Sequence, residues 1–223
     1  MITVHHLEDS RSQRLLWLLE ELGLAYEVKR YARDKKTQLA PKALYAVHPL
    51  GKSPVLEDDG LVLAESGAII EYLLARYDAE GRFKPADALS QAGRDYTYWL
   101  HFAEGSLMPY LVMVKVFDTV KRAPMPFFVR PIAKQIAGRV EGSFLKPSVT
   151  RFFDFIEAHL SKQQWFAGDA ISGADIQMSF PLEAAMAGRV VGEYPQIRAY
   201  VKRIHARDAY QRALAKGGDY SYA

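Results

Sequence analysis

Cysteine is absent from the 223 residues of this chain. Its absence excludes disulfides, thiolate-ligated metal sites and a thiol nucleophile supplied by the protein. Any sulfur chemistry must therefore come from a ligand. The sequence is also poor in metal-ligand patterns, because His5, His6 and His48 have no Asp, Glu or Cys partners at ligand spacing. We expect no metal site.

Long apolar runs and blocks of like charge are missing as well. No window approaches the roughly 18 to 20 uninterrupted apolar residues of a membrane span, and MITVHHLEDSRSQ lacks the two regions of a signal peptide. The formal charge is only +3, with acids and bases interleaved, which is not typical of a nucleic-acid-binding surface. We expect a cytoplasmic globular protein with neither membrane nor nucleic-acid partners.

The chain begins with the pattern of a β-α-β unit. ITVHHL and AYEVKRY have the character of strands, and SRSQRLLWLLEELG between them has helical spacing. Ser10, three residues before Gln13, predicts a capping box at the start of this helix, and Gly23 predicts its end.

A hairpin and a second helix complete this part. Residues 54–63 alternate around the turn DDG, and SGAIIEYLLARY follows as an amphipathic helix. The order strand, helix, strand, connection, hairpin, helix is that of a thioredoxin-like α/β domain. We place this domain at residues 1–78.

The remainder of the chain has only helical patterns. DAEGRFKPAD, with Gly and Pro between periodic segments, predicts a linker at residues 79–88, and residues 89–223 form an all-helical domain. The last residues, GGDYSYA, are expected to form a loose tail. The predicted helices cover roughly residues 89–117, 126–160, 172–187 and 194–214.

The third of these helices has a clear start signal. Ser172 is followed three residues later by Asp175, which predicts a capping box, and Ile171 is placed to contact Ile176 as a hydrophobic staple. We therefore assign Asp175 a structural role.

Pro54 stands where a strand begins, a position that tolerates the missing N–H. A trans proline that starts an edge strand is one reading. The other is a cis Ser53–Pro54 bond, which turns the Ser53 backbone outward to pair with a peptide-like ligand.

A polar pair, Glu65 and Ser66, opens the helix after the hairpin. Plain capping of that helix explains it without a ligand, but a helix N-terminus also attracts carboxylates. Lys52 adds a cation just before the proline, and Glu65 offers a carboxylate to an ammonium group. A ligand that is charged at both ends would fit this set.

Three stretches together resemble the cytosolic glutathione S-transferases, and most closely a fungal and bacterial branch. They are SRSQRLLWLLEELGLAYE, HPLGKSPVLEDDGLVLAESGAIIEYL and SGADIQMSF. The resemblance implies that Pro54 is cis, that the Ser53 backbone pairs with the cysteinyl part of glutathione, that Glu65 and Ser66 hold the γ-glutamyl end, and that Lys52 faces the glycine carboxylate.

The reaction that the resemblance implies is attack by the glutathione thiolate on an electrophilic carbon. A free thiol, with a pKa of about 8.5, is only slightly ionised at pH 7, so the site must lower that pKa. Ser10 is our candidate donor to the sulfur, and Ser12 is the alternative. Asp9 is an anion that opposes a thiolate, and Arg11 is placed to offset it.

The electrophile site is expected along the first long helix of the second domain. WLHFAEGSLMPYLVMVKVF supplies Phe102, Met108 and Tyr110 as candidate lining residues, although such spacing is also typical of a core. Pro109 predicts a break there. We interpret His101 and Glu104 as exposed helix residues.

We therefore predict a glutathione transferase acting in detoxification, with glutathione as co-substrate, no other cofactor, a small hydrophobic electrophile as second substrate, and a homodimeric assembly. A glutathione-dependent peroxidase and a non-catalytic glutathione-binding module are the alternatives. Retention of the four glutathione candidates Lys52, Pro54, Glu65 and Ser66 speaks against the second of these.

Overall fold

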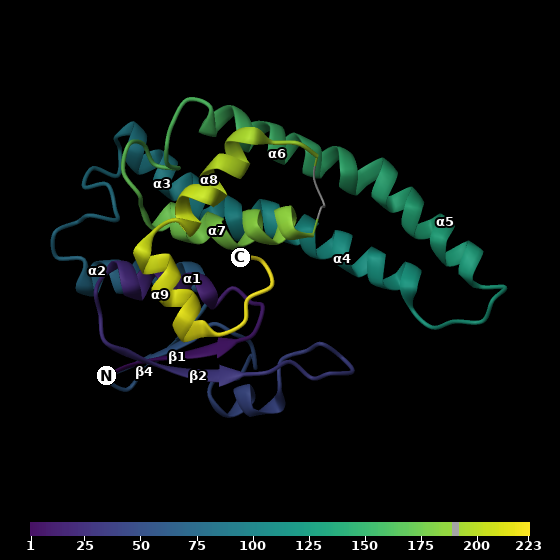
Figure 1. Cartoon of the computed structure of the whole chain (residues 1–223), viewed down its shortest axis with the longest axis horizontal. Helices are drawn as coiled ribbons and strands as arrows, with labels where there is room; N and C mark the ends of the chain where they lie inside the picture. Colours follow the sequence, from purple (N-terminus) through teal and green to yellow (C-terminus); the bar gives the residue numbers. More distant parts are fainter. Residues whose placement is uncertain (189–191) are drawn as a thin grey trace.

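A four-stranded mixed sheet forms the lower layer of the molecule in Figure 1, in the order β2-β1-β3-β4. The computed structural model describes residues 1–188 and 192–223. β1 is parallel to β2 and antiparallel to β3, so the thioredoxin-like fold of the first part is confirmed. The strands are β1 (Ile2–Leu7), β2 (Tyr26–Tyr31), β3 (Val55–Asp58) and β4 (Leu61–Ala64).

Helix α1 (Gln13–Glu21) is buried along almost its whole length, including its polar residues Gln13 and Arg14. This burial follows from its position, since α1 lies next to β1 and α2 and also packs against α7 and α9. Helix α2 (Ser66–Tyr77) follows the hairpin as predicted. A short 3₁₀ helix, Lys42–Ala46, lies between β2 and β3.

The upper layer is helical, which confirms the second half of the predicted fold (Figure 1). Helices α4 and α5 form a hairpin that projects well beyond the sheet. No helix in the described ranges is long and apolar enough to cross a membrane. The helices are α3 (Gln91–Phe102), α4 (Met108–Arg122), α5 (Arg130–Val140), α6 (Lys146–Leu160), α7 (Gly173–Ala187), α8 (Pro195–His205) and α9 (Asp208–Gly217).

Two predicted long helices each contain a π-helical turn, at Ala103–Leu107 and at Glu141–Leu145. Pro109 and Pro147 each stand two residues after such a turn. Proline lacks an N–H and its ring clashes with the carbonyl four residues earlier, and a wider turn relieves that conflict. The predicted helix at 194–214 is instead two helices, α8 and α9.

The prediction of a loose C-terminal tail is wrong. The chain end returns from α9 to α7 (Figure 1), where the Tyr220 hydroxyl donates to the buried Glu183 carboxylate at 2.7 Å. The Ser221 backbone N–H donates to Asp9 Oδ1 at 2.7 Å. The sequence suggested a tail because glycine and polar residues dominate it, but its tyrosines find apolar and carboxylate partners on other elements.

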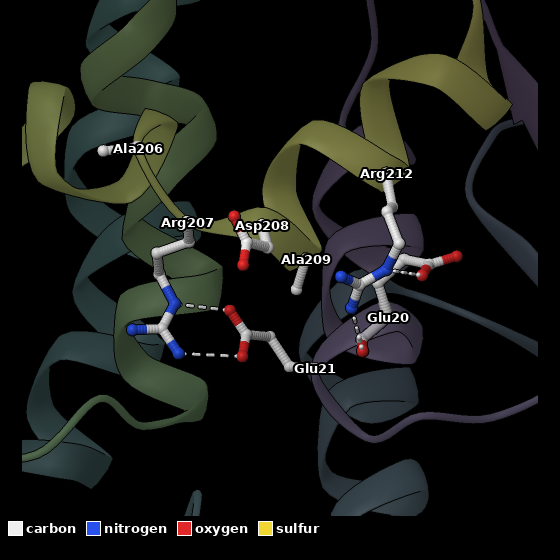
Figure 2. Close-up of a pocket in the computed structure, with 7 residues that line it drawn as sticks. All are labelled: Glu20, Glu21, Ala206, Arg207, Asp208, Ala209 and Arg212. Atoms are coloured by element: carbon white, nitrogen blue, oxygen red, sulfur yellow. Dashed lines mark hydrogen bonds and ion pairs between the residues drawn. The ribbon is translucent and has the colours of Figure 1, made fainter.

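Ion pairs hold α9 against α1. Figure 2 shows Arg207 donating to both carboxylate oxygens of Glu21, and Arg212 pairing with Glu20 at 2.8 Å. The hollow between these residues is lined by Glu20, Glu21, Arg207 and Arg212, which already pair with one another, and we assign it no ligand. The ion pairs around it fix α9, the helix that precedes the C-terminal tail.

Asp175 anchors the start of α7 as predicted, with the capping box to Ser172 present. The fully buried carboxylate also accepts the Phe166 N–H at 2.9 Å and lies 3.3 Å from the Tyr200 hydroxyl. Burial raises the pKa of Asp175 to about 6, against the lowering effect of these donors.

We expect Asp175→Ala to lower the free energy of unfolding by about 2 to 4 kcal/mol, because it removes a cap and leaves the buried Phe166 N–H without its acceptor. Ser172→Ala is the matched control, because it removes the cap and one donor to Asp175 but leaves the Phe166 N–H its acceptor, and it should cost about 1 kcal/mol. Denaturant unfolding measures both. Equal midpoints for the two variants would contradict the wider role of Asp175.

Candidate active site

The candidate catalytic serines lie in the turn between β1 and α1. The N-cap of α1 is Ser12, not Ser10, and its side chain makes no capping hydrogen bond. The predicted capping box between Ser10 and Gln13 is therefore wrong. The buried side-chain amide of Gln13 forms no hydrogen bond within the described ranges, and Ser10 Oγ instead accepts the Ser12 N–H at 3.3 Å.

Ser10, Ser12 and His6 form a buried chain of side chains. Ser10 Oγ lies 2.8 Å from Ser12 Oγ, which lies 2.8 Å from His6 Nδ1. Burial lowers the pKa of His6 to about 4, so its ring is neutral at pH 7. The neutral ring keeps one hydrogen, so Nδ1 either accepts from Ser12 Oγ or donates to it.

This arrangement distinguishes the two hydroxyls. Ser12 Oγ has two acceptors within reach besides Ser10, His6 Nδ1 at 2.8 Å and the Leu7 carbonyl at 3.3 Å, and either of them can take its single hydroxyl hydrogen. Ser12 is also completely inaccessible, whereas Ser10 keeps 5% of its surface exposed. The hydrogen of Ser10 is the one that can turn from its neighbour to a ligand.

Ser53 joins this group through the end of β1. The Leu7 N–H lies 3.2 Å from both Ser12 Oγ and Ser53 Oγ, and Ser53 Oγ donates to the His5 carbonyl at 2.8 Å. The Ser53–Pro54 peptide bond is cis. Lys52, the next residue back, is exposed.

Ser66 is tied to α1 from the other side. The buried Arg14 guanidinium donates to Ser66 Oγ at 2.5 Å and to the Gln177 carbonyl of α7 at 2.5 Å, and it also binds the Glu104 carboxylate. Glu65 is exposed beside it and has a φ of 72°, which is unusual for a residue other than glycine.

Glu104 is not the exposed helix residue that the sequence indicated. Its carboxylate accepts from Arg14 and also from Arg11 Nε, at 3.0 to 3.1 Å. Burial acts to raise the pKa of Glu104, but the two guanidinium groups lower it on balance. His101 is exposed as expected.

The sequence suggested that Arg11 offsets the charge of Asp9, but the two side chains have other partners. Its guanidinium is engaged by Glu104, and the Asp9 carboxylate instead accepts the N–H and the hydroxyl of Ser221 at 2.7 and 2.8 Å. The chain terminus thus supplies the donors that neighbouring residues were expected to supply.

A cleft of about 980 Å³ opens beside these residues. Asp9 and Arg11 lie at one side of it, and apolar side chains of α4, α6 and α7 form much of the rest. Among the described residues no cluster of His, Asp or Glu could hold a metal ion. The apolar lining includes Met108, Leu111, Val149 and Phe180.

Of the three candidate electrophile residues, the structure brings Met108 to this cleft. The Phe102 ring packs with Trp99 and Phe152, and the Tyr110 ring packs with Phe144 and Phe152, so both belong to an aromatic cluster. Neither lines the cleft in the part of the chain that the structure describes.

Sequence reasoning did not find His6, Arg14 or Tyr222, which the structure adds to the site. An arginine inside the apolar run of α1 was a usable signal, since a charged residue on a buried face needs a partner. Tyr222 had no such signal, because its partner Phe180 lies far away in the chain. His6 had none either: its partner Ser12 is only six residues away, but the end of β1 and a turn separate the two.

Comparisons with known proteins agree with this geometry. The family pattern "Glutathione S-transferase, N-terminal domain" matches residues 1–75, and "Glutathione S-transferase, C-terminal domain" matches residues 125–208. The chain is 36% identical to glutathione S-transferase 3 of Schizosaccharomyces pombe, over 98% of this chain and 89% of that protein. It is also 36% identical to glutathione S-transferase 1 of Saccharomyces cerevisiae, over 99% and 98%.

A solved structure has the same architecture over nearly the whole chain. The glutathione S-transferase of Actinobacillus pleuropneumoniae is 37% identical, with a TM-score of 0.81 that covers 99% of this chain and 94% of that one.

The Arg14–Glu104 pair makes a direct prediction. Glu104→Ala should lower the free energy of unfolding by about 2 to 3 kcal/mol, because it leaves the fully buried Arg14 without its counter-ion. Arg11→Ala is the control, since it removes only the partly exposed partner of the same carboxylate and should cost less than about 1 kcal/mol. Thermal or denaturant unfolding measures both, and similar losses would contradict the special place of Arg14.

Proposed function

The chain belongs to the glutathione S-transferase family, and from that membership we propose how its residues divide the reaction between them. The protein is a glutathione transferase, an enzyme that joins the glutathione thiolate to an electrophile. Glutathione is a substrate in this family, not a resident cofactor.

Glutathione would lie along the carboxyl end of β1, with its cysteinyl part paired to the Ser53 backbone before Pro54. Glu65 and Ser66 would hold the γ-glutamyl end, and Lys52 would face the glycine carboxylate. One observation carries this proposal, the convergence of these residues at the end of β1 and the start of α1. The Leu7 N–H bonds Ser12 Oγ and Ser53 Oγ, and Ser12 Oγ bonds Ser10 Oγ. Arg14 of α1 donates to Ser66.

Ser10 is the proposed donor to the thiolate. Ser12 Oγ already has His6 and the Leu7 carbonyl as partners and is fully buried, which favours Ser10 over the alternative. The hydrogen bond from Ser10, together with the N-terminus of α1, would lower the pKa of the bound thiol and so raise the fraction of nucleophile at neutral pH.

The electrophile would occupy the 980 Å³ cleft, against Met108 and the apolar side chains of α6 and α7. We further propose that the enzyme is cytoplasmic and acts in detoxification. Residues 1–78 would form the glutathione domain, 79–88 the linker, and 89–223 the domain that supplies the electrophile site.

We also propose a homodimer. The projecting hairpin of α4 and α5 carries several exposed large apolar side chains, and exposed apolar surface of this kind is typical of a protein interface. The residues concerned are Val116, Val120, Phe127, Phe128, Ile132 and Ile136, each at least 40% exposed.

The two charged candidates predict unequal effects on glutathione binding. We expect Glu65→Ala to weaken binding by about tenfold or more, because a charge-assisted hydrogen bond to the ammonium is covered by the ligand. Lys52→Ala should weaken it by less than about fivefold, because an ion pair at a wet rim contributes only about 0 to 1 kcal/mol. Calorimetry measures both. Unchanged affinity in Glu65→Ala would remove the γ-glutamyl assignment, and no binding by the wild type would remove the function.

We expect Ser10→Ala to change the ionisation of the bound glutathione thiol without changing the binding of glutathione. Affinity for glutathione should be nearly unchanged, while the turnover falls by roughly tenfold to a hundredfold and the pKa of the bound thiol rises. Ultraviolet absorbance of the thiolate, followed against pH, measures that pKa in the wild type, Ser10→Ala and Ser12→Ala. A shift confined to Ser12→Ala would transfer the role to that hydroxyl, and no shift in either would assign it to the helix N-terminus.

A further inference from the structure

The C-terminal tail forms part of the cleft. Tyr222 lines it together with Asp9, Arg11 and Phe180. Ser221, the chain neighbour of Tyr222, binds Asp9, the chain neighbour of Ser10, so Tyr222 lies at the end of the cleft that is near the proposed sulfur donor. Neither the proposed glutathione contacts nor the predicted electrophile residues include it.

The tail is fastened to both layers of the fold. The Tyr220 hydroxyl donates to Glu183 of α7 at 2.7 Å, while the N–H and hydroxyl of Ser221 donate to Asp9 at 2.7 and 2.8 Å. The Tyr222 ring contacts the Phe180 ring edge to face, with centroids 5.7 Å apart. Figure 1 shows the chain end beside α7, so Tyr222 is held at the cleft by contacts to both parts of the fold.

The Tyr222 hydroxyl is available to donate a hydrogen bond to a ligand. Within residues 1–188 and 192–223 it makes no hydrogen bond, and the half-buried side chain remains accessible. The nearby Asp9 carboxylate accepts from Ser221 on both oxygens. Burial and the charge of Asp9 raise the pKa of Tyr222, with Arg33 opposing, so the phenol keeps its hydrogen at neutral pH.

We propose that Tyr222 is a specificity-determining residue of the electrophile site, where it donates a hydrogen bond to an oxygen of the bound electrophile. The substrates favoured are those in which a nitro or carbonyl group conjugated to the attacked carbon takes up negative charge. This inference rests on the proposed function, since it places the electrophile in the cleft beside Ser10.

The step that Tyr222 assists is the addition of sulfur. With 1-chloro-2,4-dinitrobenzene, the thiolate forms a bond to the ring carbon, and the displaced electron pair resides on the nitro oxygens. The pair then returns to the ring, and chloride leaves with the electrons of the C–Cl bond. Tyr222 donates a hydrogen bond to a nitro oxygen throughout and transfers no proton. Benzyl bromide loses bromide in one displacement, places no charge on an oxygen, and gains nothing from this donor.

Tyr222→Phe therefore changes the preference between two electrophiles. We expect kcat/KM for 1-chloro-2,4-dinitrobenzene to fall roughly tenfold, because one donor to a delocalised oxyanion is lost, while kcat/KM for benzyl bromide stays within about twofold. The affinity for glutathione should not change, since the ring remains in place and Tyr222 is not among its proposed contacts. Equal losses on both electrophiles, or no loss on either, would overturn the proposal.

Tyr220→Phe is the matched control. It removes a phenol hydroxyl two residues away that donates to Glu183. The ratio of the kcat/KM values for the two electrophiles should therefore stay at the wild-type value. A ratio that changes as much in Tyr220→Phe as in Tyr222→Phe would show that tail anchoring, not a donor to the substrate, is responsible, and would overturn the proposal.

Product affinities provide a test that does not need turnover. Calorimetry with S-(2,4-dinitrophenyl)glutathione and S-benzylglutathione should show Tyr222→Phe weakening only the first. If the wild type conjugates neither electrophile, the proposed function fails, and these two affinities still decide whether Tyr222 recognises the nitro group.

Discussion

The buried guanidinium of Arg14 is the point at which four elements of the protein meet. It stands on α1, donates to Ser66 at the start of α2 and to a carbonyl of α7, and binds Glu104 in the π-helical turn that precedes α4. A cation without access to water is stable only if nearby groups replace its hydration. The helical layer must therefore hold Glu104 and α7 against α1, and the same contact fixes Ser66 for the proposed glutathione site.

The π-helical turn gives this arrangement its geometry. Pro109 cannot continue the α-helical hydrogen bonds of α3, and the wider turn at Ala103–Leu107 accommodates it. Glu104 lies within that turn and bonds Arg14 and Arg11. After the turn, α4 carries Met108 to the cleft. A local property of proline thus helps to determine both the contact between the layers and one wall of the cleft.

The C-terminal segment connects the same two layers by a second route. Ion pairs from Arg207 and Arg212 hold α9 on α1, and the tail then passes to Asp9 and Glu183 (Figures 1 and 2). As a result the Asp9 carboxylate, which lies next to Ser10, is satisfied by donors from the far end of the sequence. This lessens the conflict between Asp9 and a thiolate that the sequence presented.

Local and periodic features were readable from the sequence alone. Strand alternation gave β1 and β2, the DDG turn gave the hairpin, and the Ser172–Asp175 spacing gave the start of α7, because each depends on residues that are neighbours in the chain. What the sequence left open was decided by contacts between residues that are far apart in the chain. The tail, the partners of Arg14 and the separation of Met108 from Tyr110 depend on which buried polar and aromatic groups meet after folding. A buried polar group is stable only when a hydrogen-bonding or charged partner lies next to it, and only the tertiary structure determines which residue that partner is.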